Sequence, residues 1–242
     1  MKRLLFAFVI FFCSNGVAQT KQPIIIDGKI NDWPLPLLYY NAETKLSYSI
    51  RNDDSAFYFC IRATEETTQM RLARVGFQLS IDPNGKKKQK FNLVYKPETK
   101  MGPGGGSKGK PLTETLKNEF RQKLLLVSLS GFTGIANETY ISKDLKTLRF
   151  AMDWDSLNML NIEYKVPFSA IGYDTTMKQL SFGIILFAMQ MPSGGMQTPD
   201  GMGGSPPSGM SMPQGNRMPT EGMNDMFSEK IIWTKFKALI RK

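Results

Sequence analysis

Histidine is entirely absent from this 242-residue chain. It is the commonest general base in enzymes, the usual partner of a nucleophilic serine and the most frequent metal ligand. Its absence argues against most familiar hydrolase designs. A pair of carboxylates could still cleave glycosides, and Asp153 and Asp155, on either side of Trp154, are the obvious pair. Residues two apart on a strand share a face by geometry alone, so the pairing of these carboxylates needs no catalytic explanation. We expect no enzymatic activity.

Long apolar runs are also missing, since no segment reaches the roughly 18 to 20 residues that cross a bilayer. The chain opens with two basic residues, an apolar run over 4–12 and small residues that end at Ala18. This pattern predicts a signal peptide over 1–18 and export to the periplasm or the extracellular space. A lipid anchor on Cys13 is the alternative, although two bulky phenylalanines stand where lipoprotein processing needs a small residue.

Cysteine is nearly absent as well. Removal of the signal peptide would leave Cys60 alone, so no disulfide could form within the mature chain. Cys60 lies in the apolar run 57–61, which predicts a buried and unreactive thiol.

Acidic residues are outnumbered by basic ones, 21 to 31, which makes the formal net charge +10. Two of the basic residues belong to the signal peptide, which contains no acidic residue, so the mature chain carries +8. This charge favours acidic glycans, lipid headgroups or cell-surface polymers as neighbours. Nucleic acid is not an expected partner, because the chain is exported and its basic residues are scattered. Their one cluster, 86–90, follows a turn signal and suits a solvated hairpin tip.

What the chain does contain is apolar residues that alternate with polar ones, which is typical of β-strands. The runs lie at 46–50, 57–61, 77–81, 91–95, 124–129, 148–152, 162–168, 180–187 and 231–236. About nine such strands predict an all-β fold, a two-sheet antiparallel β-sandwich formed by one domain over 19–242. One helix is expected over 113–123 to cover an open edge of the sandwich, and a weaker helical pattern runs over 65–74.

Two segments break the alternation. Residues 98–112 are rich in glycine, which predicts a flexible loop. Residues 188–226 contain nine methionines, eight glycines and six prolines but no valine, isoleucine or leucine. Such a segment cannot bury enough apolar surface to offset its ordering entropy, so we expect a disordered insertion before the last strand.

The methionines of this insertion suggest three roles. Thioether sulfur is a soft ligand suited to Cu(I), or to haem iron with an unusual second ligand such as lysine. Methionine also makes adaptable apolar contacts, so the insertion could dock an envelope protein. A passive linker is the third alternative. The candidate copper ligands form three close pairs: Met189 and Met191, Met210 and Met212, Met223 and Met226.

Three blocks of sequence, in this order, resemble carbohydrate-binding module family 9 and its relatives. They are IIIDGKINDW at 24–33, LSYSIRND followed by FYF within 46–59, and IEYKVPFSAIG at 162–172. The resemblance spans about 24–187 and implies a β-sandwich with an often calcium-bearing frame. It also implies a secreted, noncatalytic module that recognises a glycan or another cell-envelope component.

Candidate binding residues follow from this expectation. Sugars are held by flat aromatic faces and a few polar groups, and the aromatic residues nearest to turns are Trp33, Tyr39, Tyr40 and Trp154. The candidates are Trp33, Tyr40 and Trp154. Core packing explains each of them equally well. Calcium requires several oxygen ligands, and the acidic residues near strand ends include Asp27, Asp32 and Asp53. Apart from this structural calcium, no cofactor is expected.

Overall fold

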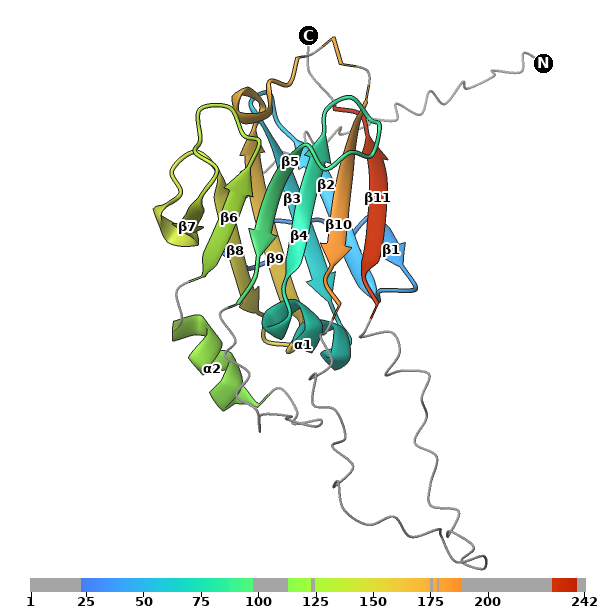
Figure 1. Ribbon diagram of the computed structural model, residues 1–242. Coiled ribbons are helices and arrows are strands. Elements are labelled where there is room, and N and C mark those ends of the chain that lie inside the picture. Colours follow the sequence, from blue (N-terminus) through green and yellow to red (C-terminus); the bar gives the residue numbers. More distant parts are fainter. Residues whose placement is uncertain are drawn as a thin grey trace, which may run out of the picture.

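Two antiparallel sheets stack face to face in the computed structural model, which confirms the β-sandwich (Figure 1). The structure describes residues 23–97, 113–122, 125–174, 176–177, 179–188 and 228–238. One sheet has five strands in the order β1-β2-β3-β9-β8, and the other has six in the order β11-β10-β4-β5-β6-β7. No helix among the described residues is long and apolar enough to span a membrane.

The five-stranded sheet consists of β1 (Tyr39–Asn41), β2 (Leu46–Asn52), β3 (Ala56–Ala63), β8 (Arg149–Trp154) and β9 (Leu160–Pro167). The six-stranded sheet consists of β4 (Phe77–Asp82), β5 (Phe91–Tyr95), β6 (Leu126–Ser130), β7 (Thr139–Ile141), β10 (Leu180–Leu186) and β11 (Lys230–Phe236). The helices are α1 (Glu66–Arg74), α2 (Glu114–Gln122) and the short 3-10 turns η1 (Ser142–Asp144) and η2 (Phe168–Ile171).

The eleven strands of the described residues include all nine predicted runs. The two additional strands, β1 and β7, are three residues long and lie at sheet edges, where alternation is too brief to detect. Both predicted helices form, and the weaker pattern becomes the full helix α1. The flexible loop predicted at 98–112 lies outside the described residues, as does the insertion at 188–226 except for Ala188.

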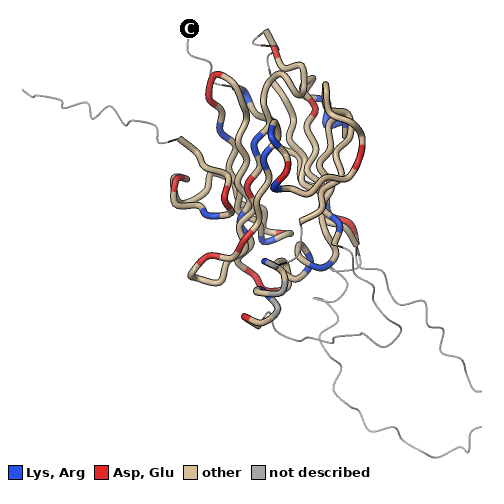
Figure 2. Tube along the Cα trace, turned by 90° about the vertical axis from the view of Figure 1, so that its left-hand side faces the viewer, with Lys and Arg blue, Asp and Glu red and all other residues tan. Residues whose placement is uncertain are grey.

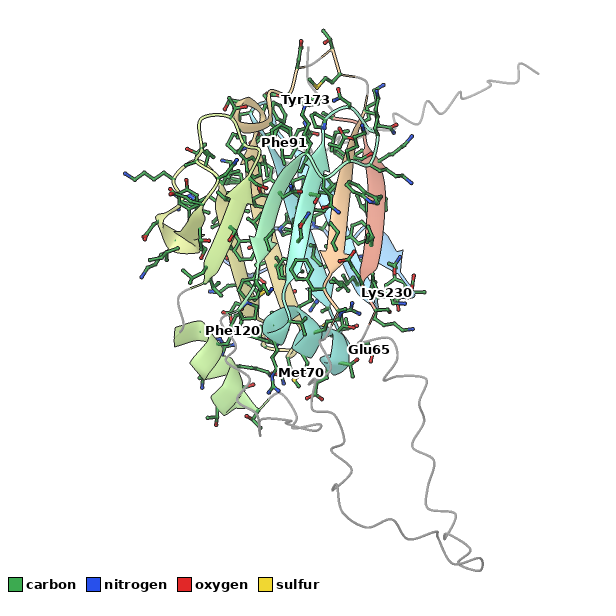
Figure 3. The ribbon with its side chains drawn as sticks, viewed as in Figure 1. Glu65, Met70, Phe91, Phe120, Tyr173 and Lys230 are labelled. Carbon is green, nitrogen blue, oxygen red and sulfur yellow. The ribbon has the colours of Figure 1, made fainter. Side chains whose placement is uncertain are left out.

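Apolar side chains from the inner faces of both sheets fill the space between them (Figure 3). Phe59 of β3 stacks on Phe182 of β10 with ring centroids 3.9 Å apart, and Tyr164 of β9 stacks on Phe59. All three are fully buried. Burial of each such side chain contributes about 1.5–3 kcal/mol, so these contacts hold the two sheets together.

Helix α1 lies at one end of the sandwich (Figure 1). Its buried Arg71 donates hydrogen bonds to the carbonyl oxygens of Leu186, Phe187 and Ser228. Leu186 is the last residue of β10 and Phe187 follows it, whereas Ser228 begins the described segment that leads into β11. One guanidinium therefore fixes the chain on both sides of 189–227.

The N-terminal segment 23–38 packs on the outer face of the five-stranded sheet. Ile30 and Trp33 from this segment meet Ala56, Tyr58 and Cys60 of β3 in a second, smaller apolar cluster. Cys60 is free and buried, as predicted, and burial raises the pKa of its thiol well above the usual value. The segment therefore buries Ala56, Tyr58 and Cys60 on the face of β3 that points away from the main core.

Candidate functional site

Two of the three candidate sugar-binding aromatic residues pack in the interior. Trp33 is 4% exposed, and its Nε1 donates a 2.7 Å hydrogen bond to Oε1 of Glu163. Trp154 is 5% exposed, and its Nε1 donates to Oε1 of Gln69 at 2.8 Å. Both indoles therefore have the packing role that the sequence also allowed. Tyr40, which is 61% exposed on β1, is the candidate whose ring can meet a ligand.

Glu163 is a buried carboxylate that the sequence did not single out. Besides Trp33, the backbone N–H groups of Asp27 and Gly28 donate to its Oε2 at 3.0 and 2.7 Å. Gly28 has a φ of +84°, and a Cβ there would lie 2.9 Å from that of Asp153, so this close approach needs glycine. Burial raises the pKa of Glu163 to about 7, against the opposing effect of its three donors. The carboxylate therefore anchors the N-terminal segment to β9.

The three candidate calcium ligands accept hydrogen bonds from backbone N–H groups close to them in the sequence. Asp27 accepts the N–H of Lys29, and Asp32 accepts the N–H of Ile25. Asp53 accepts hydrogen bonds from two backbone N–H groups and from the side chains of Ser55 and Tyr58. Within the part of the chain that the structure describes, no three acidic or cysteine side chains gather where one metal ion could bind.

The paired carboxylates around Trp154 both have basic partners. Asp153 accepts a 2.7 Å hydrogen bond from Nε of Arg121, and Asp155 accepts one of 2.6 Å from Arg62. Burial raises the pKa of Asp155, but hydrogen bonds from Met159 and Asn161 and the charge of Arg62 outweigh it and lower that pKa overall. An ionised Asp155 cannot act as a general acid at neutral pH. The six candidate copper-binding methionines lie outside the described residues.

The outer face of the six-stranded sheet carries an aromatic residue that the sequence analysis missed. Trp233 of β11 is directly opposite Gly183 of β10 and half-buried. A Cβ at Gly183 would lie 2.8, 2.9 and 3.0 Å from three atoms of the six-membered ring of Trp233, so the flat face of the indole covers the glycine. A glycine inside an apolar strand often marks such a close approach, and this was the available signal.

The same row continues across the sheet with small polar residues. From Trp233 and Gly183 the direct cross-strand partners are Ser80 of β4, Asn92 of β5 and Ser130 of β6. Gln78, two residues before Ser80 on the same face, donates from Nε2 to Ser80, Gln89 and Asn92 at 2.8, 3.0 and 3.1 Å. We call Trp233, Gly183, Ser80, Asn92, Ser130 and Gln78 the sheet-face platform.

Side-chain hydrogen bonds hold the polar part of this platform in place. Oγ of Ser80 donates to Oδ1 of Asn92 at 2.8 Å, and Nδ2 of Asn92 donates to Oγ of Ser130 at 3.2 Å. The half-buried amides of Gln78 and Asn92 thus have defined orientations before any ligand arrives. Basic and acidic residues are interspersed over the sandwich (Figure 2), but two exposed lysines, Lys90 and Lys235, lie beside this row.

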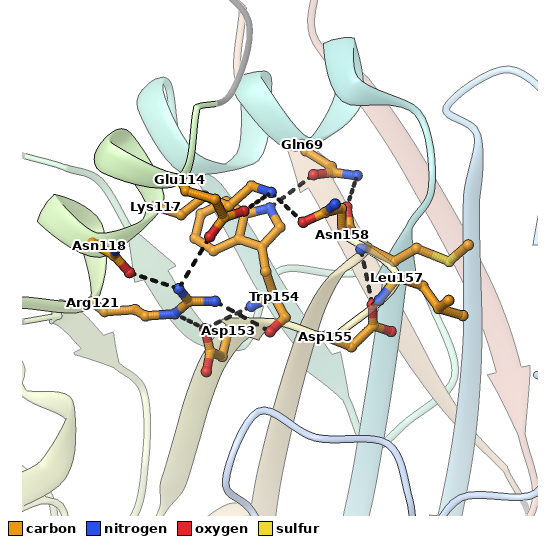
Figure 4. Close-up of polar contacts among 11 residues, drawn as sticks. Gln69, Glu114, Lys117, Asn118, Arg121, Asp153, Trp154, Asp155, Leu157 and Asn158 are labelled. Carbon is orange, nitrogen blue, oxygen red and sulfur yellow. Dashed lines mark hydrogen bonds and ion pairs between the residues drawn. The ribbon is translucent and has the colours of Figure 1, made fainter.

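A pocket of about 460 Å³ lies elsewhere, along β8. Its walls come from α2, η1, β8 and the turn at Ile26 and Asp27. Arg121 of α2 reaches into this region and contacts Asp153, Asn118 and Glu114 (Figure 4). On the other side of Trp154, the buried Lys117 bonds to Glu114 and to Oδ1 of Asn158. These contacts attach α2 to the end of β8.

The chain matches no protein-family model, no curated protein and no solved structure in the three comparisons made.

Proposed function

We propose that this protein is a noncatalytic binding module that recognises a glycan through the sheet-face platform. The single observation that carries the proposal is the indole of Trp233, which lies flat on Gly183 within a row of oriented polar side chains. The pyranose faces of sugars are flat and carry C–H groups, and they stack on such aromatic faces. Tyr40 lies on the other sheet, in a row that continues through Ser47 and Arg62, but there Arg62 is held in an ion pair with Asp155.

The polar row supplies the second half of sugar recognition. Hydroxyl groups of a saccharide both donate and accept hydrogen bonds, and so do amide and serine side chains. Ser80 lies between Gly183 and Asn92 in this row and is fully buried, so the half-buried amides of Gln78 and Asn92 are the polar groups that a sugar ring on the indole would meet. Because the amides are already oriented, little side-chain entropy is lost on binding.

The nearby charges favour an acidic glycan. Lys90 and Lys235 are exposed and border the row of the platform, so carboxylated or sulfated sugars would gain Coulomb attraction that salt screens. The resemblance to carbohydrate-binding module family 9 supports a glycan ligand. Export, which the N-terminal sequence pattern predicts, would place the protein where envelope and extracellular glycans occur.

The test uses the full mature chain on a broad glycan array and in pull-downs with insoluble polysaccharides, at low and high salt. We expect binding by the wild type and about a tenfold or greater loss for Trp233→Ala, because stacking and apolar contact contribute roughly 1–3 kcal/mol. Tyr40→Ala removes an exposed aromatic ring from the other sheet and is the matched control. The proposal fails if the wild type binds no glycan, or if Trp233→Ala binds as well as the wild type.

A further inference from the structure

Strand β8 is an edge of the five-stranded sheet and pairs with β9 only. The backbone N–H of Asp155 donates to the carbonyl of Met159 at 3.0 Å, where the hairpin to β9 begins. Because antiparallel strands direct alternate residues toward each neighbour, the odd-numbered residues of β8 bond to β9. Phe150, Met152 and Trp154 therefore direct their backbone polar groups away from the sheet.

At Trp154 these outward groups have partners. Its N–H donates to Oδ1 of Asp153 at 2.7 Å, and its carbonyl accepts a 3.4 Å hydrogen bond from Arg121 (Figure 4). Among the described residues, no hydrogen-bond partner meets the outward N–H or C=O of Phe150 and Met152. Their side chains are buried between the sheets. The free edge thus offers two donors and two acceptors in the spacing of a β-ladder.

The pocket along β8 gives this edge the shape of a slot. Residues 149–153 line one side of this slot. Phe120 and Leu125 are apolar residues of its lining, as are Phe150 and Met152. Five strand residues span about 16 Å at the usual rise of roughly 3.3 Å per residue. The slot therefore suits an extended chain of a few residues.

The charges around the slot favour one kind of partner. Arg149 and Lys143 line it, are exposed, and have no ion-pair partner among the described residues. Asp153, the acidic residue on the edge, is paired with Arg121, and Asp27 is the other acidic residue of the lining, so the slot has three basic and two acidic side chains. Lys165 lies beside Arg149 on β9 and adds further positive charge. An incoming β8 of a second copy would meet these cations with its own, which disfavours self-pairing.

We propose that the free edge of β8 binds an extended acidic polypeptide as an added antiparallel strand. Main-chain hydrogen bonds to Phe150 and Met152 provide the pairing, which is the established chemistry of β-strand addition. Side chains of the ligand opposite Phe150 and Met152 turn toward Leu125 and are apolar, whereas the one opposite Arg149 is acidic. This site is separate from the sheet-face platform and does not depend on the proposed glycan function.

The probe is a labelled peptide of about seven residues that alternates glutamate and valine, titrated by fluorescence anisotropy against the mature chain. N-methylation of the valine amides, which would face β8, should weaken binding about tenfold or more, whereas N-methylation of the glutamate amides should not. Arg149→Glu should weaken binding by a similar factor and should prefer a lysine–valine peptide. Equal binding of both N-methylated peptides, or no binding of the parent peptide, overturns the proposal.

Amide hydrogen exchange provides a readout at the edge itself. The N–H groups of Phe150 and Met152 should exchange fast in the free protein and become protected when the peptide binds. Protection of both amides before the peptide is added overturns the proposal, because the edge would then be covered already. Trp233→Ala should leave peptide binding unchanged, and Arg149→Glu should leave glycan binding unchanged, so the two functions fail independently.

Discussion

The indole N–H of Trp33 donates a 2.7 Å hydrogen bond to the carboxylate of Glu163, across 130 positions of the chain. Together with two backbone N–H groups from Asp27 and Gly28, it gives this buried carboxylate three donors. Glu163 lies at an outward-facing position of β9, and these hydrogen bonds make it the anchor of the N-terminal segment.

The first prediction concerns this anchor. At pH 8, where folded Glu163 is mostly ionised, Glu163→Gln should lower the free energy of unfolding by about 1–3 kcal/mol, because an amide NH₂ in place of one carboxylate oxygen faces a donor and leaves a buried group unpaired. Urea denaturation followed by far-UV circular dichroism measures the loss. Glu229→Gln, at an exposed position, is the control and should be neutral. Equal stability of the two variants would show that the three donors do not require a carboxylate.

The second prediction is a pH dependence from the same residue. Burial raises the pKa of folded Glu163 to about 7, whereas an unfolded glutamate titrates near about 4.3. The folded state therefore binds the proton more tightly, and this contribution to stability is full below the unfolded pKa and is lost as pH rises to about 7.

The measurement compares wild type with Glu163→Gln at pH 5 and pH 8. Between these values the wild type should lose about 1–3 kcal/mol more unfolding free energy than the variant, which has no proton to release at position 163. The same pH dependence in both proteins would contradict the assignment to Glu163.

The third prediction concerns Arg71. Arg71→Met should lower the free energy of unfolding by about 2–4 kcal/mol, because it strips hydrogen bonds from the carbonyls of Leu186, Phe187 and Ser228. The stability of Arg71→Lys should fall between those of the wild type and Arg71→Met, because an ammonium cannot reproduce the forked donor geometry of a guanidinium. Thermal unfolding would rank the three proteins. An Arg71→Met variant as stable as the wild type would mean that water molecules hydrogen-bond to these carbonyls equally well.

The fourth prediction tests the support beneath Trp233. Gly183→Ala places a methyl group 2.8–3.0 Å from the indole ring, so the ring must shift or tilt. Glycan affinity should fall about threefold to tenfold while peptide binding at β8 stays unchanged, because the flat face is no longer held parallel to the sheet. Isothermal titration with the tightest array ligand measures this. Undiminished glycan affinity would exclude any need for a flat indole.

Most of the fold could be predicted because alternation is local. All nine apolar runs became strands, and the short edge strands β1 and β7 were missed because three residues carry no periodicity. The candidate site was harder to predict. Trp33 and Trp154 are of a residue type that binds sugars, but the surrounding structure buries them. Trp233 was missed because it lies within a run of apolar residues that predicts only a strand.

The amino-acid sequence by itself determined the two-sheet architecture, the buried thiol at Cys60 and both helices, because side-chain periodicity acts within a few residues. Only the tertiary structure decided which groups come together and which stay without a partner among the described residues: Trp33 bonds to Glu163, Trp233 lies on Gly183, and the N–H groups of Phe150 and Met152 point outward. Strand order and register set these contacts, and both depend on pairing between residues far apart in the chain.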